Sequence, residues 1–181
     1  MLKKYAITIL LIIATGVAFF LLLKLCTPKI AYVRSAELVN KYEGMKESRT
    51  MYKDKIAQWQ SNIDTLESDY QKSVSKYTLE STKQSAAARI ESENLLEKQR
   101  QNIQQYVKTL DEKAREEDQK MTERVINQIN SFVEQYGKQH GYDFILGTTQ
   151  SGNILYGSSS KDMTEEVLKE LNESYKAGGI K

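Results

Sequence analysis

The sequence predicts a mainly α-helical protein with a small β body, a long antiparallel helical hairpin and an N-terminal transmembrane or signal helix. Three observations predict this class. Residues 5–23 carry no charge, residues 45–136 contain neither glycine nor proline, and short β-favouring stretches lie on either side of that helical section. The chain has a formal net charge of only +2, so it offers no large basic face for nucleic acid, and we expect no nucleic-acid partner.

Residues 1–28 form the predicted N-terminal membrane anchor or signal segment. As a helix, residues 5–23 would span about 28 Å, which matches the hydrocarbon core of a bilayer. Large or charged residues at 23–25 precede Cys26, where a signal-cleavage site or a lipidated cysteine requires small ones. These flanks favour a retained anchor that contacts the membrane through residues 5–23, with a cleaved signal and a lipoprotein as alternatives.

Residues 29–44 read as the first strand and a short helix of the body. Residues 30–33 are β-favouring, Ser35 is a candidate N-cap, and apolar residues from 36 to 42 share one helical face. We expect Gly44 to close this helix.

Residues 45–136 form the predicted helical hairpin arm. Alternate steps of four and three from Met45 meet mostly apolar or aromatic residues, as in a coiled coil. The pattern lapses from Thr78 to Ala88 and a second stripe follows, so we expect two helices joined near 76–84. Ser81 and Gln84 have the spacing of a capping box that would start the second helix. The arm seam predicted from the first stripe is Tyr52, Ile56, Trp59, Ile63, Leu66 and Tyr70.

The turn of this hairpin carries a local excess of positive charge. Between residues 72 and 89 the only acidic residue is Glu80. A solvated turn without a role explains such a cluster as well as a binding site does. The residues of this possible basic tip are Lys72, Lys76, Lys83 and Arg89.

Residues 137–175 read as the rest of the body, with a flexible tail over 176–181. Gly137 is expected to end the long helix, residues 142–146 and 153–156 to pair as a hairpin, and Asp162 or Thr164 to cap a final helix. A sheet this small is marginal in one chain, so we expect several copies to pool their strands. The expected oligomerisation residues are Ile30, Tyr32, Val33, Phe144, Leu146, Ile154 and Tyr156.

No catalytic, cofactor-binding or metal-binding constellation is visible in the sequence. There is no glycine-rich phosphate loop, and the single histidine, His140, has no neighbouring cluster of ligands. His140 is expected to be a helix-end or loop residue. We therefore expect a protein that is not an enzyme and has no cofactor.

Four segments carry a resemblance to a known family: KIAYV at 29–33, GYDFILG at 141–147, SGNILYG at 151–157 and DMTEEVL at 162–168. Together with the long charged hairpin, they resemble the Skp/OmpH family of periplasmic chaperones over residues 29–175. The resemblance implies a homotrimer with a short-stranded β-barrel oligomerisation body and three α-helical hairpin tentacles around a cavity. The N-terminus departs from the family, where a cleaved signal is usual.

The function that this resemblance implies is that of an ATP-independent holdase chaperone that keeps unfolded outer-membrane proteins soluble for assembly. The expected location is the periplasmic side of the cell envelope, anchored by the N-terminal helix, or soluble in the periplasm after signal cleavage. The alternative is a membrane-tethered coiled-coil scaffold or spacer that binds one specific folded envelope partner.

Overall fold

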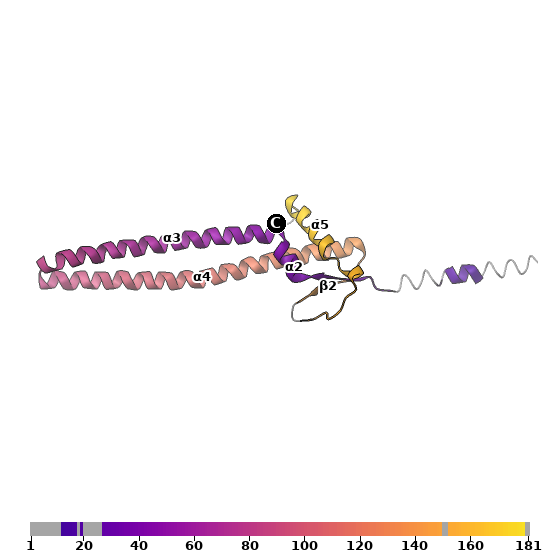
Figure 1. Cartoon of the computed structure of the whole chain (residues 1–181), viewed down its shortest axis with the longest axis horizontal. Coiled ribbons are helices and arrows are strands. Elements are labelled where there is room, and N and C mark those ends of the chain that lie inside the picture. Colours follow the sequence, from indigo (N-terminus) through magenta and orange to yellow (C-terminus); the bar gives the residue numbers. More distant parts are fainter. Residues whose placement is uncertain (1–11, 18, 20–26, 150–151, 180–181) are drawn as a thin grey trace, which may run out of the picture. The chain divides into compact units, whose positions relative to one another are not determined.

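The computed structural model describes residues 12–17, 19, 27–149 and 152–179 (Figure 1). The chain divides into two compact units, which we call the body (residues 1–42 and 128–181) and the arm (residues 43–127). The described part is mainly helical with one small sheet, so the coarse fold class is confirmed.

The sheet of the body has two parallel strands. β1 (Ile30–Arg34) pairs with β2 (Phe144–Thr148), with Ile30 opposite Phe144 and Arg34 opposite Thr148. The hairpin predicted between residues 142–146 and 153–156 is wrong, because β2 pairs with β1 and the described residues after Thr148 form no second partner strand. Side-chain hydrogen bonds replace the expected ladder: Asn153 Nδ2 donates to the Gly147 carbonyl at 2.6 Å, and Asn153 Oδ1 accepts from Thr149 N at 2.7 Å.

Two helices pack against β1 and close the core of the body. They are α2 (Ser35–Lys41) and α5 (Thr164–Lys176), and the short 3₁₀ turn η2 (Ser159–Lys161) leads into α5. Tyr42 is fully buried, and its ring meets that of Tyr175 edge to face at 5.3 Å. Burial, with the neighbouring Tyr175, raises the pKa of Tyr42 to about 12. The buried core of the body consists of Ala31, Val33, Leu38, Tyr42, Ile129, Tyr136, Thr164, Val167, Leu168 and Leu171.

The long helix that enters the body ends later than predicted. α4 (Ala86–His140) continues through Gly137 and stops at Gly141, whose φ is +65°. Gly141 N donates to the Lys138 carbonyl, and Tyr142 N donates to the Gly137 carbonyl at 2.9 Å. These two bonds form a Schellman motif with Gly141 at the left-handed C′ position, so Gly137 is not the terminator.

The arm consists of α3 (Glu43–Glu80), the 3₁₀ turn η1 (Ser81–Lys83) and the first part of α4, with α3 and α4 antiparallel (Figure 1). Gly44 does not close the helix before it, because α2 ends at Lys41, Tyr42 is extended, and Gly44 lies in the first turn of α3.

The predicted capping box at the arm turn is also wrong. α4 begins at Ala86, and its first turn is capped by the Ser85 hydroxyl, which accepts from Ala88 N at 3.2 Å. Ser81 instead opens η1, and only its backbone carbonyl accepts a bond, from Gln84 N. The polar chain between the two helices therefore places the true N-cap four residues later.

The predicted membrane segment, residues 5–23, lies mostly outside the described residues. Within it, residues 12–17 and 19 are helical. Among the helices that the structure describes, none combines the length and the apolar character needed to cross a bilayer. Of the predicted tail, residues 180–181 also lie outside the described part.

Candidate functional site

One face of the two-stranded sheet is largely apolar and only partly covered in the single chain. Side chains alternate along a strand, so Ala31 and Val33 point into the body, where they are 2% and 4% exposed. The opposite face, which we call the sheet face, carries the apolar side chains of Ile30, Tyr32, Phe144 and Leu146. Phe144 is 57% exposed and Leu146 44%. Of the predicted oligomerisation residues, Val33 therefore belongs to the chain's own core.

The chain after β2 exposes two more apolar side chains. Leu155 is 93% exposed and Tyr156 88%, whereas Ile154 is half-buried. Sequence reasoning missed Leu155, because a strand at 153–156 would have turned it away from Ile154 and Tyr156. The backbone at Gly157 lies close to the Tyr32 ring, and a Cβ added at Gly157 would lie 2.4 Å from that ring.

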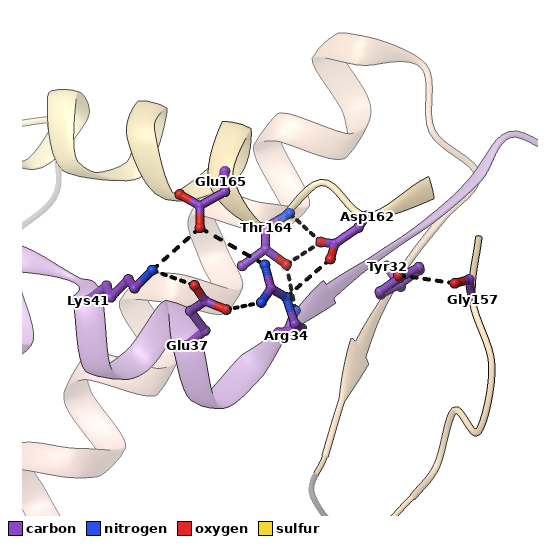
Figure 2. A network of polar contacts seen from close by, with 8 residues as sticks. All are labelled: Tyr32, Arg34, Glu37, Lys41, Gly157, Asp162, Thr164 and Glu165. Carbon is purple, nitrogen blue, oxygen red and sulfur yellow. Dashed lines mark hydrogen bonds and ion pairs between the residues drawn. The ribbon is translucent and has the colours of Figure 1, made fainter. Parts of the chain in front are cut away.

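A polar network fixes the end of β1 to the start of α5 (Figure 2). The Arg34 guanidinium lies 3.1 Å from the Asp162 carboxylate. Thr164 is fully buried; its hydroxyl donates to Asp162 and accepts from Arg34 N at 2.9 Å. Burial acts to raise the pKa of Asp162, but the hydrogen bonds from Thr164 and the charge of Arg34 outweigh it and hold the pKa below its usual range.

The same network extends to α2. Glu37 accepts from Lys41 and pairs with Arg34, and Lys41 also reaches Glu165 at 3.4 Å (Figure 2). The hydrogen bond from Lys41 is the main cause that lowers the pKa of Glu37. Because three elements converge on these charges, the network sets how α2 and α5 flank β1, and with it the position of the sheet face.

His140 is the last residue of α4 and stacks on Tyr136 at 4.1 Å between ring centroids. Its Nδ1 donates to the Tyr136 carbonyl at 3.0 Å. Lys29 Nζ donates to the His140 carbonyl at 2.8 Å and lies 3.8 Å from the centre of the Tyr142 ring. The histidine thus belongs to a packed cap at the helix end, where the lysine charge also suits the helix dipole.

The predicted arm seam lies between α3 and α4 but is only partly covered. Tyr52, Ile56, Trp59, Ile63 and Tyr70 are half-buried, and Leu66 is 41% exposed.

Polar bonds connect the two helices along this seam. The Tyr52 hydroxyl donates to the Ala114 carbonyl at 3.2 Å, and Lys55 pairs with Glu117 at 2.9 Å. Two helices without further cover cannot bury a seam on all sides, so the arm offers aromatic and aliphatic groups along its length.

The possible basic tip residues are all exposed. Lys72 forms an ion pair with Asp69 at 2.9 Å, three residues away on the same helix. Lys76, Lys83 and Arg89 surround the turn between α3 and α4. Sequence reasoning missed the apolar groups interspersed with these charges, namely Leu79, Ile90 and Leu95, which are 76%, 59% and 58% exposed.

A family model described as outer membrane protein (OmpH-like) matches residues 29–171. The chain belongs to the OmpH-like family. The match covers the whole arm and the body from Lys29, directly after the predicted anchor segment, to Leu171 in α5. The resemblance seen in the sequence is therefore confirmed at the level of the family.

Two individual proteins that resemble this chain share only low sequence identity with it. The chaperone protein Skp of Yersinia enterocolitica is 23% identical over 146 residues, which are 79% of this chain and 85% of the relative. A crystal structure of a candidate OmpH-like outer membrane chaperone from Caulobacter crescentus superimposes with a TM-score of 0.72. It is 15% identical and covers 82% of this chain and 86% of its own, so this likeness shows the fold.

Proposed function

We propose that this chain is an ATP-independent holdase chaperone that binds unfolded outer-membrane proteins in the cell envelope and keeps them soluble for assembly. The observation that carries the proposal is the partly exposed arm seam of Tyr52, Trp59, Leu66 and their neighbours in a member of the OmpH-like family. A holdase needs many weak apolar contacts and no bond-breaking chemistry. The arm supplies such contacts in a form that water and an unfolded chain can reach.

The active form that we propose is a homotrimer. The sheet face, with Phe144 and Leu146 largely exposed, and the neighbouring Leu155 and Tyr156 are apolar surfaces that a lone soluble chain would not keep in water. A closed barrel made from the strands of three chains would cover the sheet face and remove the open strand edges. Three arms would then project from one body and enclose a cavity.

The proposed location is the periplasmic side of the envelope. Retention of residues 5–23 as an anchor would keep the chaperone beside the membrane, whereas cleavage would release it into the periplasm. Intact-mass measurement of the mature protein distinguishes these two forms.

The test is suppression of aggregation. A chain that starts at Lys29 is added in several-fold trimer excess to a urea-unfolded β-barrel membrane protein, the urea is diluted, and light scattering is followed without ATP. We expect scattering to be suppressed, and the mass in analytical ultracentrifugation to be that of a trimer. Unchanged scattering together with a monomer mass would contradict the proposal.

A matched variant tests the link between body and activity. Phe144→Asp places a charge on the sheet face without touching the core, and we expect a monomer that suppresses aggregation less. Gln139→Glu, at an exposed position near the end of α4, adds the same single negative charge and serves as the control. Recovery of one stoichiometric folded partner from envelope extracts, with no barrel proteins, would instead support the scaffold alternative.

A further inference from the structure

Two methionines of the arm come from different helices and line the same depression. Met51 lies on α3 and Met121 on α4, and the depression that both line has a volume of about 260 Å³. We call these two residues the methionine pair. The other residues that line the depression are Ser48, Tyr52, Lys55, Glu117 and Arg124.

The ion pair between Lys55 and Glu117, 2.9 Å long, shows that the two methionines lie at one level of the arm. α3 and α4 are antiparallel, so one turn back along α3 from Lys55 and one turn forward along α4 from Glu117 lead to the same level (Figure 1). The residues reached in this way are Met51 and Met121. A spacing of four residues also places each methionine on the helix face that carries the charged residue.

The methionines of the described chain differ in exposure, which governs how readily an oxidant reaches the sulfur. Met51 is 66% exposed and Met121 is half-buried, whereas Met45 of the same arm is only 2% exposed. Met163 of the body is half-buried, and its sulfur accepts a hydrogen bond from the Tyr142 hydroxyl at 3.4 Å. The methionine pair therefore combines one thioether that is open to solvent with one that is partly covered.

We infer that the methionine pair is a site of reversible oxidation by peroxides and that oxidation of Met121 loosens the arm. In this reaction a lone pair of the thioether sulfur attacks one oxygen of hydrogen peroxide, and the O–O bond breaks. The sulfur loses two electrons and becomes a sulfoxide, while the second oxygen leaves and takes up the proton of the first to form water. Thiol-dependent methionine sulfoxide reductases return the polar sulfoxide to the thioether.

The consequence differs between the two methionines because their burial differs. At Met51 the new oxygen is hydrated where it stands. At Met121 the partly covered oxygen also needs a hydrogen-bond donor, since a shielded polar group without one costs free energy. Lys55 is already paired with Glu117, and Arg124 lies on the same helix as Met121, so a bond from Arg124 would not join α3 to α4. We therefore expect water to enter between the helices and local opening to become easier.

The first test compares rates of oxidation. The full chain in phospholipid nanodiscs is treated with hydrogen peroxide, catalase stops the reaction, and peptide mass spectrometry follows each methionine. We expect Met51 to react about as fast as free N-acetylmethionine, Met121 roughly threefold more slowly and Met45 roughly tenfold more slowly. If Met45 reacts as fast as either member of the pair, exposure does not select the site and the inference is overturned.

The second test measures local opening by hydrogen exchange before and after peroxide. Amides at residues 48–55 and 114–124 should exchange roughly threefold faster in the oxidised chain, while those of the body stay unchanged. Methionine sulfoxide reductases A and B with dithiothreitol should restore the original rates, because each enzyme reduces one of the two sulfoxide epimers. Unchanged exchange in the fully oxidised chain would overturn the inference.

Three variants assign the response to one sulfur. Met121→Leu keeps an apolar side chain of similar size and should abolish the response to peroxide. Met51→Leu and Met163→Leu should keep it, since the first sulfoxide is hydrated in place and the second lies in the body. A response that persists in Met121→Leu overturns the assignment to Met121. The reversal by reductases uses the unaltered chain, so the inference can still fail if this variant does not fold. It goes beyond the proposed function and stands or falls whatever the holdase assay shows.

Discussion

The body and the arm bury their apolar residues to very different extents. In the body, Leu38, Val167 and Leu171 are 0 to 1% exposed, and a polar network joins β1, α2 and α5 around them. In the arm, Met45, Leu110 and Val125 are also buried, but the predicted seam residues are half-buried or, for Leu66, 41% exposed. Polar pairs within one helix, such as Arg100 with Glu97 and Lys120 with Glu116, accompany them. The body is therefore stabilised mainly by a core, whereas the part of the arm that carries the predicted seam depends more on many small local contacts.

Stability and the binding of unfolded chains place opposite requirements on the burial of apolar side chains. A residue that stabilises the fold benefits from complete burial, because replacing a buried leucine by alanine lowers the free energy of unfolding by about 2–5 kcal/mol. A position that must bind varied unfolded chains has to stay reachable by solvent. The body meets the first demand and the arm the second, so substitutions should affect stability unequally in the two units.

The largest expected effect is that of Leu171→Ala in the body. Leu171 is fully buried, so we expect a loss of about 2–5 kcal/mol in the free energy of unfolding. The matched change in the arm, Ile63→Ala at a half-buried position, should cost about 1 kcal/mol. Urea unfolding at one fixed protein concentration measures both. Equal costs would show that the arm is as tightly packed as the body.

The second-largest loss of stability is expected for Gly157→Ala, because Gly157 lies close to the Tyr32 ring. An alanine Cβ at 157 would lie 2.4 Å from Tyr32 Cε1, so Gly157→Ala must displace the ring, at a cost of about 1–3 kcal/mol. The double variant Gly157→Ala/Tyr32→Leu removes the clashing ring atoms and should recover part of that loss. If the double variant loses as much free energy of unfolding as its two single variants added together, the clash with the ring is not the cause of the loss in Gly157→Ala.

The sequence predicted the arm better than the body, because the arm depends on local pattern. A stretch without glycine or proline and a repeat of apolar positions are sufficient to specify α3 and α4. The pairing of β1 with β2 depends instead on residues far apart in the chain: Lys29 N donates to the Asp143 carboxylate across 114 positions. Nearest-neighbour reasoning therefore paired 142–146 with 153–156, where Asn153 instead holds the loop by side-chain bonds.

The candidate sites, too, could be predicted from the sequence only where they depend on residues of a single helix. Tyr52, Trp59 and Leu66 followed from heptad spacing. The depression lined by Leu66, Gln99 and Tyr106 did not, because it needs residues from both α3 and α4. Gly137 and Gly141 are equally good terminators by sequence, and only the two carbonyls that accept from Gly141 N and Tyr142 N distinguish them. Sequence patterns thus specify helices, whereas sites depend on which elements meet.

The third effect is that of Asp162 in the polar network. Asp162→Asn keeps the shape and an amide oxygen that can still accept from Thr164, but it removes the charge that faces Arg34, so we expect a loss of about 1 kcal/mol at neutral pH. Since the pKa of Asp162 is lowered in the folded chain, its contribution is complete above the unfolded value of about 4 and declines as pH falls through the folded value. The difference between wild type and variant should therefore shrink as pH falls below about 4. Urea unfolding of both proteins over that pH range measures this difference. A difference that stays constant with pH would show that the charge of Asp162 does not stabilise the fold.

The smallest expected effect lies at the arm turn, where Ser85→Ala removes the cap from Ala88 N. The bond is 3.2 Å long and exposed, so we expect a loss of only about 0.5 kcal/mol, confined to the first turns of α4. Hydrogen exchange reports local opening, and amides at residues 86–92 should exchange roughly twofold faster while those of the body stay unchanged. Ser81→Ala is the matched control, because the Ser81 hydroxyl caps nothing in the described turn, and it should leave exchange unaltered. Faster exchange throughout both units after Ser85→Ala would mean that the arm and the body open together, and the contrast between a core-stabilised unit and a locally stabilised one would then be wrong.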